Sequence, residues 1–267
     1  MSSNSSLDRM LAILAAFDDQ RLSLDVAEVE AITGASRATA YRYLQALTRS
    51  GLLTSSVDGR FVIGSRPMEL ARLKAENDPL VAAARHKIRF HAAELGVSVM
   101  LCSFFGDRVL CVESVWQGDT PQVYRSGHAV PMFRGAMGKV ILARLPSAQL
   151  RSIYRMNAPA IANAGLGDTV EAFVATMRNI RAAGVLTSCG EVVSDLVGIA
   201  APIVPAGGSV MGSIVYALPR RQFEATDPAM LKSRLQQLAA DIETDLVQRG
   251  FNATATMKMP RSPVFTA

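Results

Sequence analysis

The chain contains 267 residues with a formal net charge of +5, and 49% of its residues are hydrophobic while 19% are charged. This composition excludes a globally disordered protein. The length allows one small and one medium domain, which we favour, or one large α/β domain, and the modest positive charge identifies no partner by itself. The longest apolar stretch, Leu196 to Ala206, is interrupted by prolines and is shorter than the roughly 18 residues of a membrane span, so we expect a cytoplasmic protein without membrane contact.

The first fifty residues carry the pattern of three short helices. Apolar residues recur at helical spacing over Ser6 to Phe17 and predict a first amphipathic helix. Asp25 and Glu28 have the spacing of a capping box, and Gly34 suits the end of the short second helix that they would start. A third helix is expected from the N-cap Ser36 through Arg49. Two helices joined by a tight, glycine-bearing turn predict a helix-turn-helix.

The third helix has an outer face suited to DNA. Ala40, Leu44 and Leu47 form its apolar stripe and leave polar side chains on the other faces. Arginine and glutamine can bind base edges, and hydroxyl groups can bind phosphates. An ordinary solvated helix face is the alternative reading of the same residues. The candidate DNA contacts on this helix are Ser36, Arg37, Thr39, Tyr41, Arg42 and Gln45.

A β-hairpin is predicted directly after this helix. Two short strand-like runs, Leu52 to Thr54 and Arg60 to Ile63, flank the turn sequence Asp58-Gly59. From Ser36 to Met68 there are five basic residues and one acidic residue, a bias that the rest of the N-terminal region lacks. Phosphate neutralisation supplies most non-specific DNA affinity, so this local bias favours a winged helix-turn-helix, with Arg60 as the candidate wing contact.

A domain boundary is expected near Asn77-Asp78-Pro79, where one helix pattern stops and another starts. We predict a DNA-binding domain at residues 1–66, a linker helix at 67–78, a second domain at 79–250 and a flexible tail at 251–267. Strands mixed with helices and joined by hairpins give the second domain an α+β fold with a mainly antiparallel sheet. Its helices are expected near residues 80–95, 137–145, 169–182 and 227–247, and its strands near 97–104, 109–115, 185–193, 197–204 and 210–218.

Both halves of the chain resemble the IclR family of transcriptional regulators. The N-terminal resemblance lies in L-x-x-M-L-x-I-L-x-x-F and T-G-A-S-R-A-T-A-Y-R-Y-L-Q-A-L, and the C-terminal one in G-K-V-I-L-A and G-I-A-A-P-I. The resemblance implies a winged helix-turn-helix, a GAF-like α/β effector-binding domain, and dimers or dimers of dimers on two-fold operators. It also implies a small-ligand pocket between the sheet of that domain and the loop at Gly135 to Lys139.

The ligand class can be narrowed from the same region. Acid-binding members of the family carry serines where Val215 and Ala217 stand here, so we hypothesise an aromatic or otherwise hydrophobic small acid. The backbone N–H groups of Ala136 and Met137 could receive its carboxylate, although a purely structural turn is an equal alternative. A P-loop is excluded because Phe133 stands where it needs glycine. The candidate effector residues are Met132, Gly135, Ala136, Met137, Cys189, Val215 and Ala217, with Arg125 or Arg134 for a carboxylate.

An enzyme is the rival class, but the sequence supplies little chemistry for one. It contains no H-E-x-x-H and no G-x-S-x-G motif, and His86 and His91 have a spacing that separates them on a helix, so both are expected at the surface. The three cysteines include no C-x-x-C pair and are expected to be reduced and mostly buried. We therefore expect no catalytic residue, metal or cofactor. A constitutive DNA-binding protein whose second domain only oligomerises remains the alternative to a ligand sensor.

Overall fold

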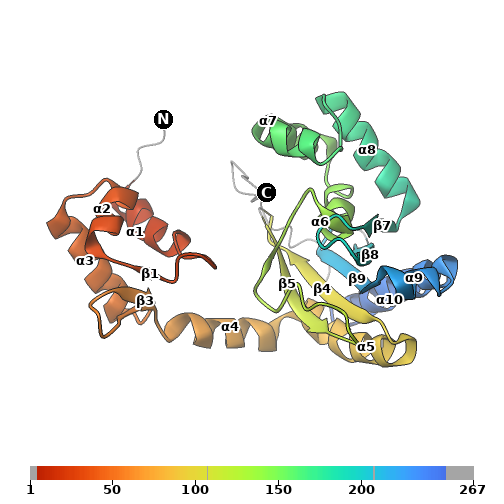
Figure 1. The fold of residues 1–267 in the computed structure, drawn as a ribbon, viewed down its shortest axis with the longest axis horizontal. Coiled ribbons are helices and arrows are strands. Elements are labelled where there is room, and N and C mark those ends of the chain that lie inside the picture. Colours follow the sequence, from red (N-terminus) through yellow and green to blue (C-terminus); the bar gives the residue numbers. More distant parts are fainter. Residues whose placement is uncertain (1–4, 107, 207, 251–267) are drawn as a thin grey trace. The chain divides into compact units, whose positions relative to one another are not determined.

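The computed structural model describes residues 5–106, 108–206 and 208–250, and the chain divides into two compact units, Met1–Asn77 and Asp78–Ala267 (Figure 1). The tail predicted at residues 251–267 lies outside the described residues. Each unit has its own buried apolar cluster, so each is described separately.

The first unit is a winged helix-turn-helix. Its three strands form an antiparallel sheet in the order β1-β3-β2, and its core contains Ile13, Leu24, Val29, Leu44 and Leu53. The two-residue strand β1 was not predicted, because it is too short to show an alternating pattern. In chain order the elements are α1 (Ser6–Ala15), β1 (Ser23–Leu24), α2 (Val26–Thr33), α3 (Arg37–Arg49), β2 (Leu53–Ser55), β3 (Phe61–Ile63) and α4 (Arg66–Asn77).

The helix ends in this unit follow the capping chemistry of the sequence, with one exception. Asp25 and Glu28 form the predicted capping box of α2, and Gly34 ends this helix in the left-handed conformation at φ 62°. Ser36 lies at the N-cap position of α3, as predicted, but its side chain does not form the expected capping hydrogen bond. Its hydroxyl donates to the Thr39 hydroxyl at 3.2 Å and makes no capping hydrogen bond to the backbone of α3.

The second unit is built on a six-stranded sheet whose order is β6-β5-β4-β9-β8-β7, with every neighbouring pair antiparallel. The α+β class with a mainly antiparallel sheet is confirmed. The elements are α5 (Pro79–Leu95), β4 (Ser98–Phe104), β5 (Val109–Val115), β6 (Ala129–Val130), α6 (Gly135–Leu142), α7 (Ser147–Asn163), α8 (Val170–Ala183), β7 (Leu186–Cys189), β8 (Leu196–Ile203), β9 (Gly212–Pro219), α9 (Arg220–Glu224) and α10 (Pro228–Gln248).

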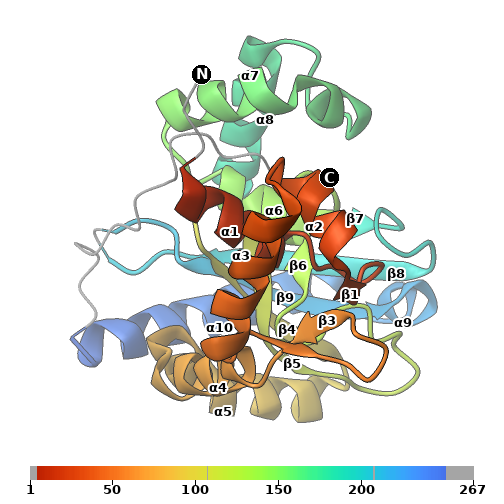
Figure 2. The ribbon, with the colours of Figure 1, turned by 90° about the vertical axis from the view of Figure 1, so that its left-hand side faces the viewer.

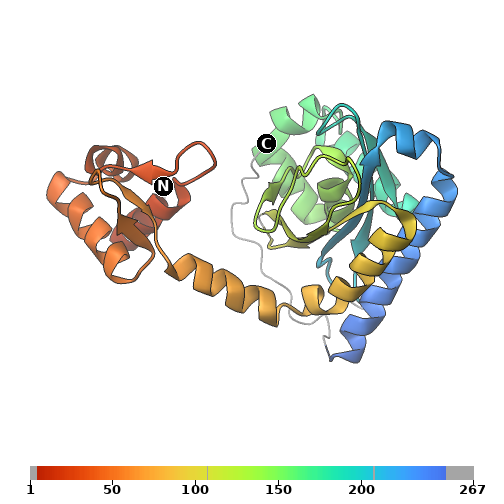
Figure 3. The same cartoon turned by 60° about the horizontal axis from the view of Figure 1, so that its bottom comes forward.

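Helices cover both faces of this sheet. Helices α5 and α10 pack against each other and against one face, as Figure 3 shows for the yellow and blue helices. Helix α6 lies on the other face, where α7 and α8 also pack (Figure 2). Two apolar cores result, and residues that alternate along β9 belong to different ones: Val215 and Ala217 face α6, whereas Tyr216 faces α5.

Helix α7 was not predicted, because its sequence does not show a continuous helical repeat of apolar residues. Pro159 lies inside it, and Asn157 leaves the helical region at φ −132° and ψ 19°, which kinks the helix. The Asn157 side chain donates to the Ile153 carbonyl at 2.9 Å. The five-residue helix α9 and the two-residue strand β6 were also not predicted, and β7 ends at Cys189 instead of continuing to residue 193.

One histidine prediction is corrected by α5. His86 is exposed as expected, but His91 is buried, and its Nδ1 lies 2.6 Å from the Tyr216 hydroxyl. The reason is helical spacing, since His91 follows Ala84 and Ile88 on the stripe that packs on the sheet. Burial lowers the pKa of His91, so the imidazole is held neutral in the core.

Candidate functional site

The outer face of α3 is the first candidate site. The side chains of Ala40, Leu44 and Leu47 are buried against the rest of the unit, and so is Tyr43, whose hydroxyl lies 2.8 Å from that of Ser6. The predicted DNA contacts remain outside this stripe: Ser36, Arg37, Tyr41, Arg42 and Gln45 are exposed and Thr39 is half-buried. Helix α3 therefore presents two arginines, a tyrosine and a glutamine on a single rigid element.

Arg60 has a different environment from these residues. Its guanidinium group binds the carboxylates of Asp25 at 3.2 Å and Glu28 at 2.7 Å, and its Nε donates to the Ser23 hydroxyl. The same two carboxylates form the capping box of α2. Arg60 thus ties the hairpin to the start of α2, and its donors are used inside the unit, so we leave it out of the proposed DNA contacts.

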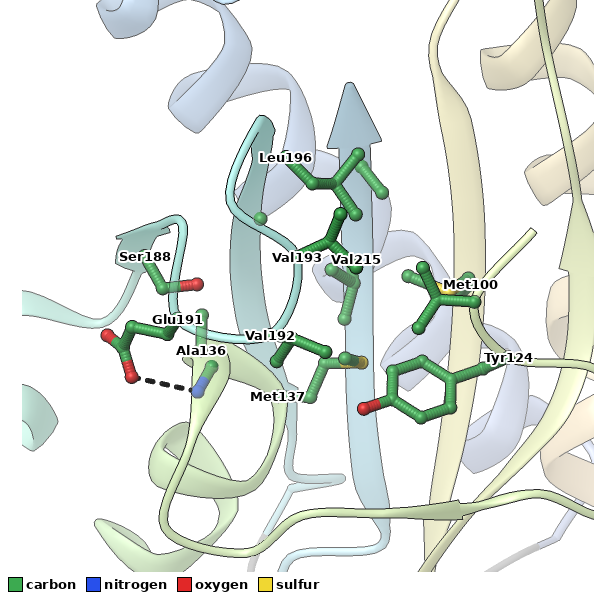
Figure 4. Close-up of a pocket in the computed structure, with 14 residues that line it drawn as sticks. Met100, Tyr124, Ala136, Met137, Ser188, Glu191, Val192, Val193, Leu196 and Val215 are labelled. Atoms are coloured by element: carbon green, nitrogen blue, oxygen red, sulfur yellow. Dashed lines mark hydrogen bonds between the residues drawn. The ribbon is translucent and has the colours of Figure 1, made fainter. Parts of the chain in front are cut away.

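The second candidate site is a pocket between the sheet and α6 (Figure 4). Its walls surround about 410 Å³ of space, a volume that includes the open solvent at its mouth. Five of the predicted effector residues line it, namely Gly135, Ala136, Met137, Val215 and Ala217. The rest of the lining is mostly apolar and comes from Met100, Val123, Val192, Val193, Leu196 and Gly198, with Tyr124, Ser188 and Glu191 as its polar members.

A carboxylate of the chain itself occupies the start of α6. The Glu191 carboxylate accepts a hydrogen bond from the Gly135 N–H at 2.9 Å. It also forms an ion pair with Lys139 Nζ at 2.6 Å. A helix N-terminus favours negative charge, and Lys139 is only 6% exposed, so each group stabilises the others. This end of the pocket is therefore already close to electrically neutral.

Tyr124 supplies a neutral hydroxyl group to the pocket. Burial raises its pKa to about 12, so the phenol stays protonated at physiological pH. Figure 4 shows its ring beside Met137 and Met100, with the hydroxyl directed into the space that they share. The pocket can therefore offer the Tyr124 hydroxyl as a hydrogen-bonding group within a mostly apolar wall.

Four predicted effector residues do not line this pocket. Met132 is buried in the core, where its backbone packs on Gly138 so closely that an added Cβ there would lie 2.5 Å from the Met132 carbonyl oxygen. Cys189 and Arg125 are exposed. The expectation of mostly buried thiols is confirmed, since Cys102 and Cys111 are buried. Arg134 is exposed and donates to the Glu191 carbonyl at 2.5 Å.

Two of the missed pocket residues lie next to predicted ones. Ser188 precedes Cys189 on β7, and Tyr124 precedes Arg125, and in each case the neighbour faces the pocket instead. On β7 successive residues point to opposite faces, so a one-residue error in the expected register exchanges Ser188 for Cys189. Tyr124 and Arg125 lie in the loop before β6, where no strand pattern indicates which residue faces inward. No local sequence pattern pointed to Glu191 as a pocket residue or to its pairing with Lys139.

Comparison with known protein families decides the assignment. Residues 6–56 match the IclR helix-turn-helix domain, and residues 74–244 match the family described as bacterial transcriptional regulator IclR C-terminal. The chain belongs to the IclR family. It is thus a transcriptional regulator with a DNA-binding helix-turn-helix, and the pocket lies in the IclR C-terminal domain.

Relatives of this IclR-family chain match it over most of its length. It is 26% identical to the HTH-type transcriptional regulator TtgV of Pseudomonas putida over 85% of this chain and 88% of TtgV. It is 27% identical to the Pca regulon regulatory protein of Pseudomonas putida over 78% of this chain and 72% of that protein. Both relatives are regulatory proteins.

Solved structures of IclR proteins share the fold. An IclR homologue from Microbacterium hydrocarbonoxydans, complexed with 4-hydroxybenzoate, superposes with a TM-score of 0.70 at 22% identity and covers 91% of this chain and all of its own, at 100%. An IclR family transcriptional regulator from Brucella abortus gives a TM-score of 0.72 at 20% identity over 90% of this chain and 91% of its own. Among the described residues of the IclR-family chain, no helix is long and apolar enough to cross a membrane.

Proposed function

We propose that this IclR-family regulator binds operator DNA through α3, and that a small hydrophobic or aromatic acid in the pocket beside α6 changes the operator affinity. The observation that supports binding of such a ligand is the pocket itself, whose walls are mostly apolar and contain few polar groups. Sites of this kind take a small ligand by its apolar body and fix it by a small number of hydrogen bonds.

The DNA half rests on the exposed side chains of α3. Arg37 and Arg42 can bind guanine edges or phosphates, and Gln45 can bind an adenine edge. Tyr41 is half exposed, at 50%, and carries a hydroxyl for a phosphate. The two arginines form no ion pair with another described residue, so both guanidinium groups are available to a polyanion.

The ligand half follows from what the pocket walls can bind. An aromatic ring would contact Met100, Met137 and Val215, and the Tyr124 hydroxyl is placed to hydrogen-bond a polar substituent. The carboxylate of the ligand would accept hydrogen bonds from the N–H groups of Ala136 and Met137 at the start of α6, because the Gly135 N–H already donates to Glu191. The relative from Microbacterium hydrocarbonoxydans, complexed with 4-hydroxybenzoate, supports this ligand class by analogy.

The proposal includes an oligomer and a route for coupling. A dimer, or a dimer of dimers, would place two copies of α3 on a two-fold operator. An effector can change DNA affinity only by favouring one arrangement of the two recognition helices, and we assign the transmission to the linker helix α4. The rival is a regulator whose second domain only oligomerises, and for that protein no ligand would alter operator affinity.

The test is a mobility-shift titration of the purified full chain on DNA from upstream of its own gene. It is run without ligand and with benzoate, 4-hydroxybenzoate or glyoxylate. We expect specific retardation in every case and a shift in apparent Kd with the aromatic acids only. Retardation that no acid changes would favour the oligomerisation rival, whereas a response to glyoxylate alone would contradict the apolar-ligand assignment. Failure to retard duplex DNA at low salt would overturn the whole proposal.

A further inference from the structure

A second cavity lies at the opposite end of α6 from the candidate effector pocket and shares no lining residue with it. It encloses about 660 Å³, again counting the space at its mouth. Strand β7 starts at Leu186 opposite Ala200, so the last residues of β8 run past it and leave a sheet edge that α10 flanks. The cavity is lined by Arg144, Gly184, Ala201, Pro202, Val204, Gln236, Ala239, Ala240 and Glu243.

Arg144 is the unusual residue of this cavity. The residue is half-buried, and its guanidinium group makes no hydrogen bond or ion pair with any residue that the structure describes. Its Nε is wholly buried without a partner. A buried donor that lacks a partner costs free energy, and native proteins seldom leave one unsatisfied. An arginine offers five donors in a planar fork, so a group that the structure does not contain is the natural partner.

The surroundings of Arg144 determine the charge of that partner. Arg181 is held beside it, because its guanidinium group donates to the Arg144 carbonyl at 3.3 Å. Glu243 is the opposing charge, but one of its oxygens accepts the Val204 N–H at 2.6 Å. Burial and the nearby Arg181 lower the pKa of Arg144, and burial raises that of Glu243, so neither group is fully compensated. Two cations and one carboxylate leave a local charge of about +1, so the cavity favours an anion, and the planar fork of a single arginine matches the two oxygens of a carboxylate.

We propose that this cavity is a second ligand site, in which the Arg144 guanidinium binds the carboxylate of a small organic acid. The Gln236 amide is available on α10 to hydrogen-bond the rest of the ligand, and the apolar side chains of Ala239 and Pro202 bound the space. A ligand here would contact the chain two residues beyond the end of α6, whereas the candidate effector pocket uses the start of the same helix. The inference stands whether or not the first pocket binds an effector.

The test is calorimetric titration of the full chain with succinate, and with inorganic phosphate as the comparison anion. We expect succinate to bind, and the Arg144→Gln variant to weaken it by about tenfold or more, the strength of hydrogen bonds to a charged group. Arg144→Lys keeps the charge but not the planar fork of donors, so its affinity for succinate should lie between those of the wild type and Arg144→Gln. Arg178→Gln removes the same charge from an exposed position on α8 outside the cavity, and should leave the affinity unchanged.

Two further measurements make every outcome decisive. Succinate binding is repeated in Ala217→Leu, which fills the first pocket; binding that disappears there belongs to that pocket and overturns the second site. Melting temperatures without ligand show whether Arg144→Gln is folded, and a folded Arg144→Lys variant carries the test if it is not. Equal binding by Arg144→Gln and Arg178→Gln, preference for phosphate, or no succinate binding by the wild-type chain would each overturn the proposal. A changed oligomeric state of Arg144→Gln, without anion binding, would assign the cavity to a second copy of the chain.

Discussion

Lys139 and Glu191 form an ion pair of 2.6 Å that joins α6 to the loop after β7. The same carboxylate accepts the Gly135 N–H, so the favourable position for an anion at this helix end is filled by the chain itself. A ligand acid in the candidate pocket must therefore enter beside an existing carboxylate whose charge Lys139 offsets. This arrangement favours a ligand that binds mainly by its apolar body.

The ion pair leads to a stability prediction. Glu191→Gln leaves the Lys139 ammonium buried without a counter-charge, and we expect the free energy of unfolding to fall by about 2 kcal/mol. This lies below the full cost of breaking a buried pair because Glu191 is itself 35% exposed. Urea denaturation followed by circular dichroism measures the change. Glu171→Gln is the control, since its pair with Arg151 is exposed and should be worth less than about 0.5 kcal/mol; equal losses in both variants would refute the prediction.

Filling the pocket should separate ligand response from DNA binding. Ala217 lies on β9 in the pocket wall, and Ala217→Leu adds three carbon atoms to that space at a cost of about 1–3 kcal/mol in overpacking. We expect this variant to retard operator DNA like the wild type, but to respond to 4-hydroxybenzoate only at concentrations roughly tenfold higher or more. Cys189→Ala, at an exposed position outside the lining, should respond normally. An unaltered response in Ala217→Leu would place the effector elsewhere.

The fold could be predicted from the sequence where one pattern dominated. The α3 stripe and the Asp25 capping box are local signals, because the residues that make them lie within one or two helical turns. The kinked helix α7 could not be predicted in this way, because Asn157 and Pro159 interrupt the helical repeat of apolar residues on which such a prediction depends. Very short strands such as β1 are defined by their partners and not by their own sequence.

The site was less predictable than the fold, because it depends on contacts between distant segments. Ser188 and Tyr124 line the pocket in place of their neighbours Cys189 and Arg125, and only the pairing of β7 and the path of the chain before β6 fix which residue faces inward. The Lys139 and Glu191 pair spans 52 positions. Neither residue type nor spacing could have identified it.

The stability of the second unit should depend on pH through His91. Burial lowers its folded-state pKa below the unfolded value of about 6.5, so the unfolded chain binds more protons as the pH falls through this range. The stability is therefore fully present above about pH 6.5 and is lost progressively below it. The charges around His91 are Glu94, Arg234 and Asp241, and its hydrogen-bond partner is Tyr216.

Urea midpoints between pH 7.5 and 5.5 measure this dependence. His91→Gln keeps a hydrogen-bonding group for Tyr216 but cannot titrate, and we expect the slope of stability against pH to be flatter than in the wild type. His86→Gln, an exposed position on the same helix, should retain the wild-type slope. A slope that His91→Gln does not reduce would mean that other groups set the acid sensitivity.

Arg60 should act on the stability of the first unit. Arg60→Ala removes both carboxylate contacts and the hydrogen bond to Ser23, and we expect the free energy of unfolding of this unit to fall by about 1 kcal/mol, since the network is partly exposed. The loss should shrink in high salt, which screens the ion pairs. Arg42→Ala, which breaks no ion pair among the described residues, serves as the control. If Arg60→Ala is as stable as Arg42→Ala, the hairpin is held to α2 by other contacts.

The recognition surface on α3 can be tested by the salt dependence of DNA binding. Each cation that neutralises a phosphate contributes about 0.9 to the slope of log affinity against log salt concentration, whereas an arginine on a base edge contributes affinity with less salt dependence. For Arg37→Ala with Arg42→Ala we expect at least roughly a tenfold loss of operator affinity and a slope lower by about one to two. Fluorescence anisotropy between about 50 and 200 mM salt, on the order of the physiological range, measures the operator affinity and its salt slope. Arg178→Ala removes a charge from α8 and not from α3, and we expect it to change neither of them. Retained affinity and slope in the double variant would show that DNA is bound by a surface other than α3.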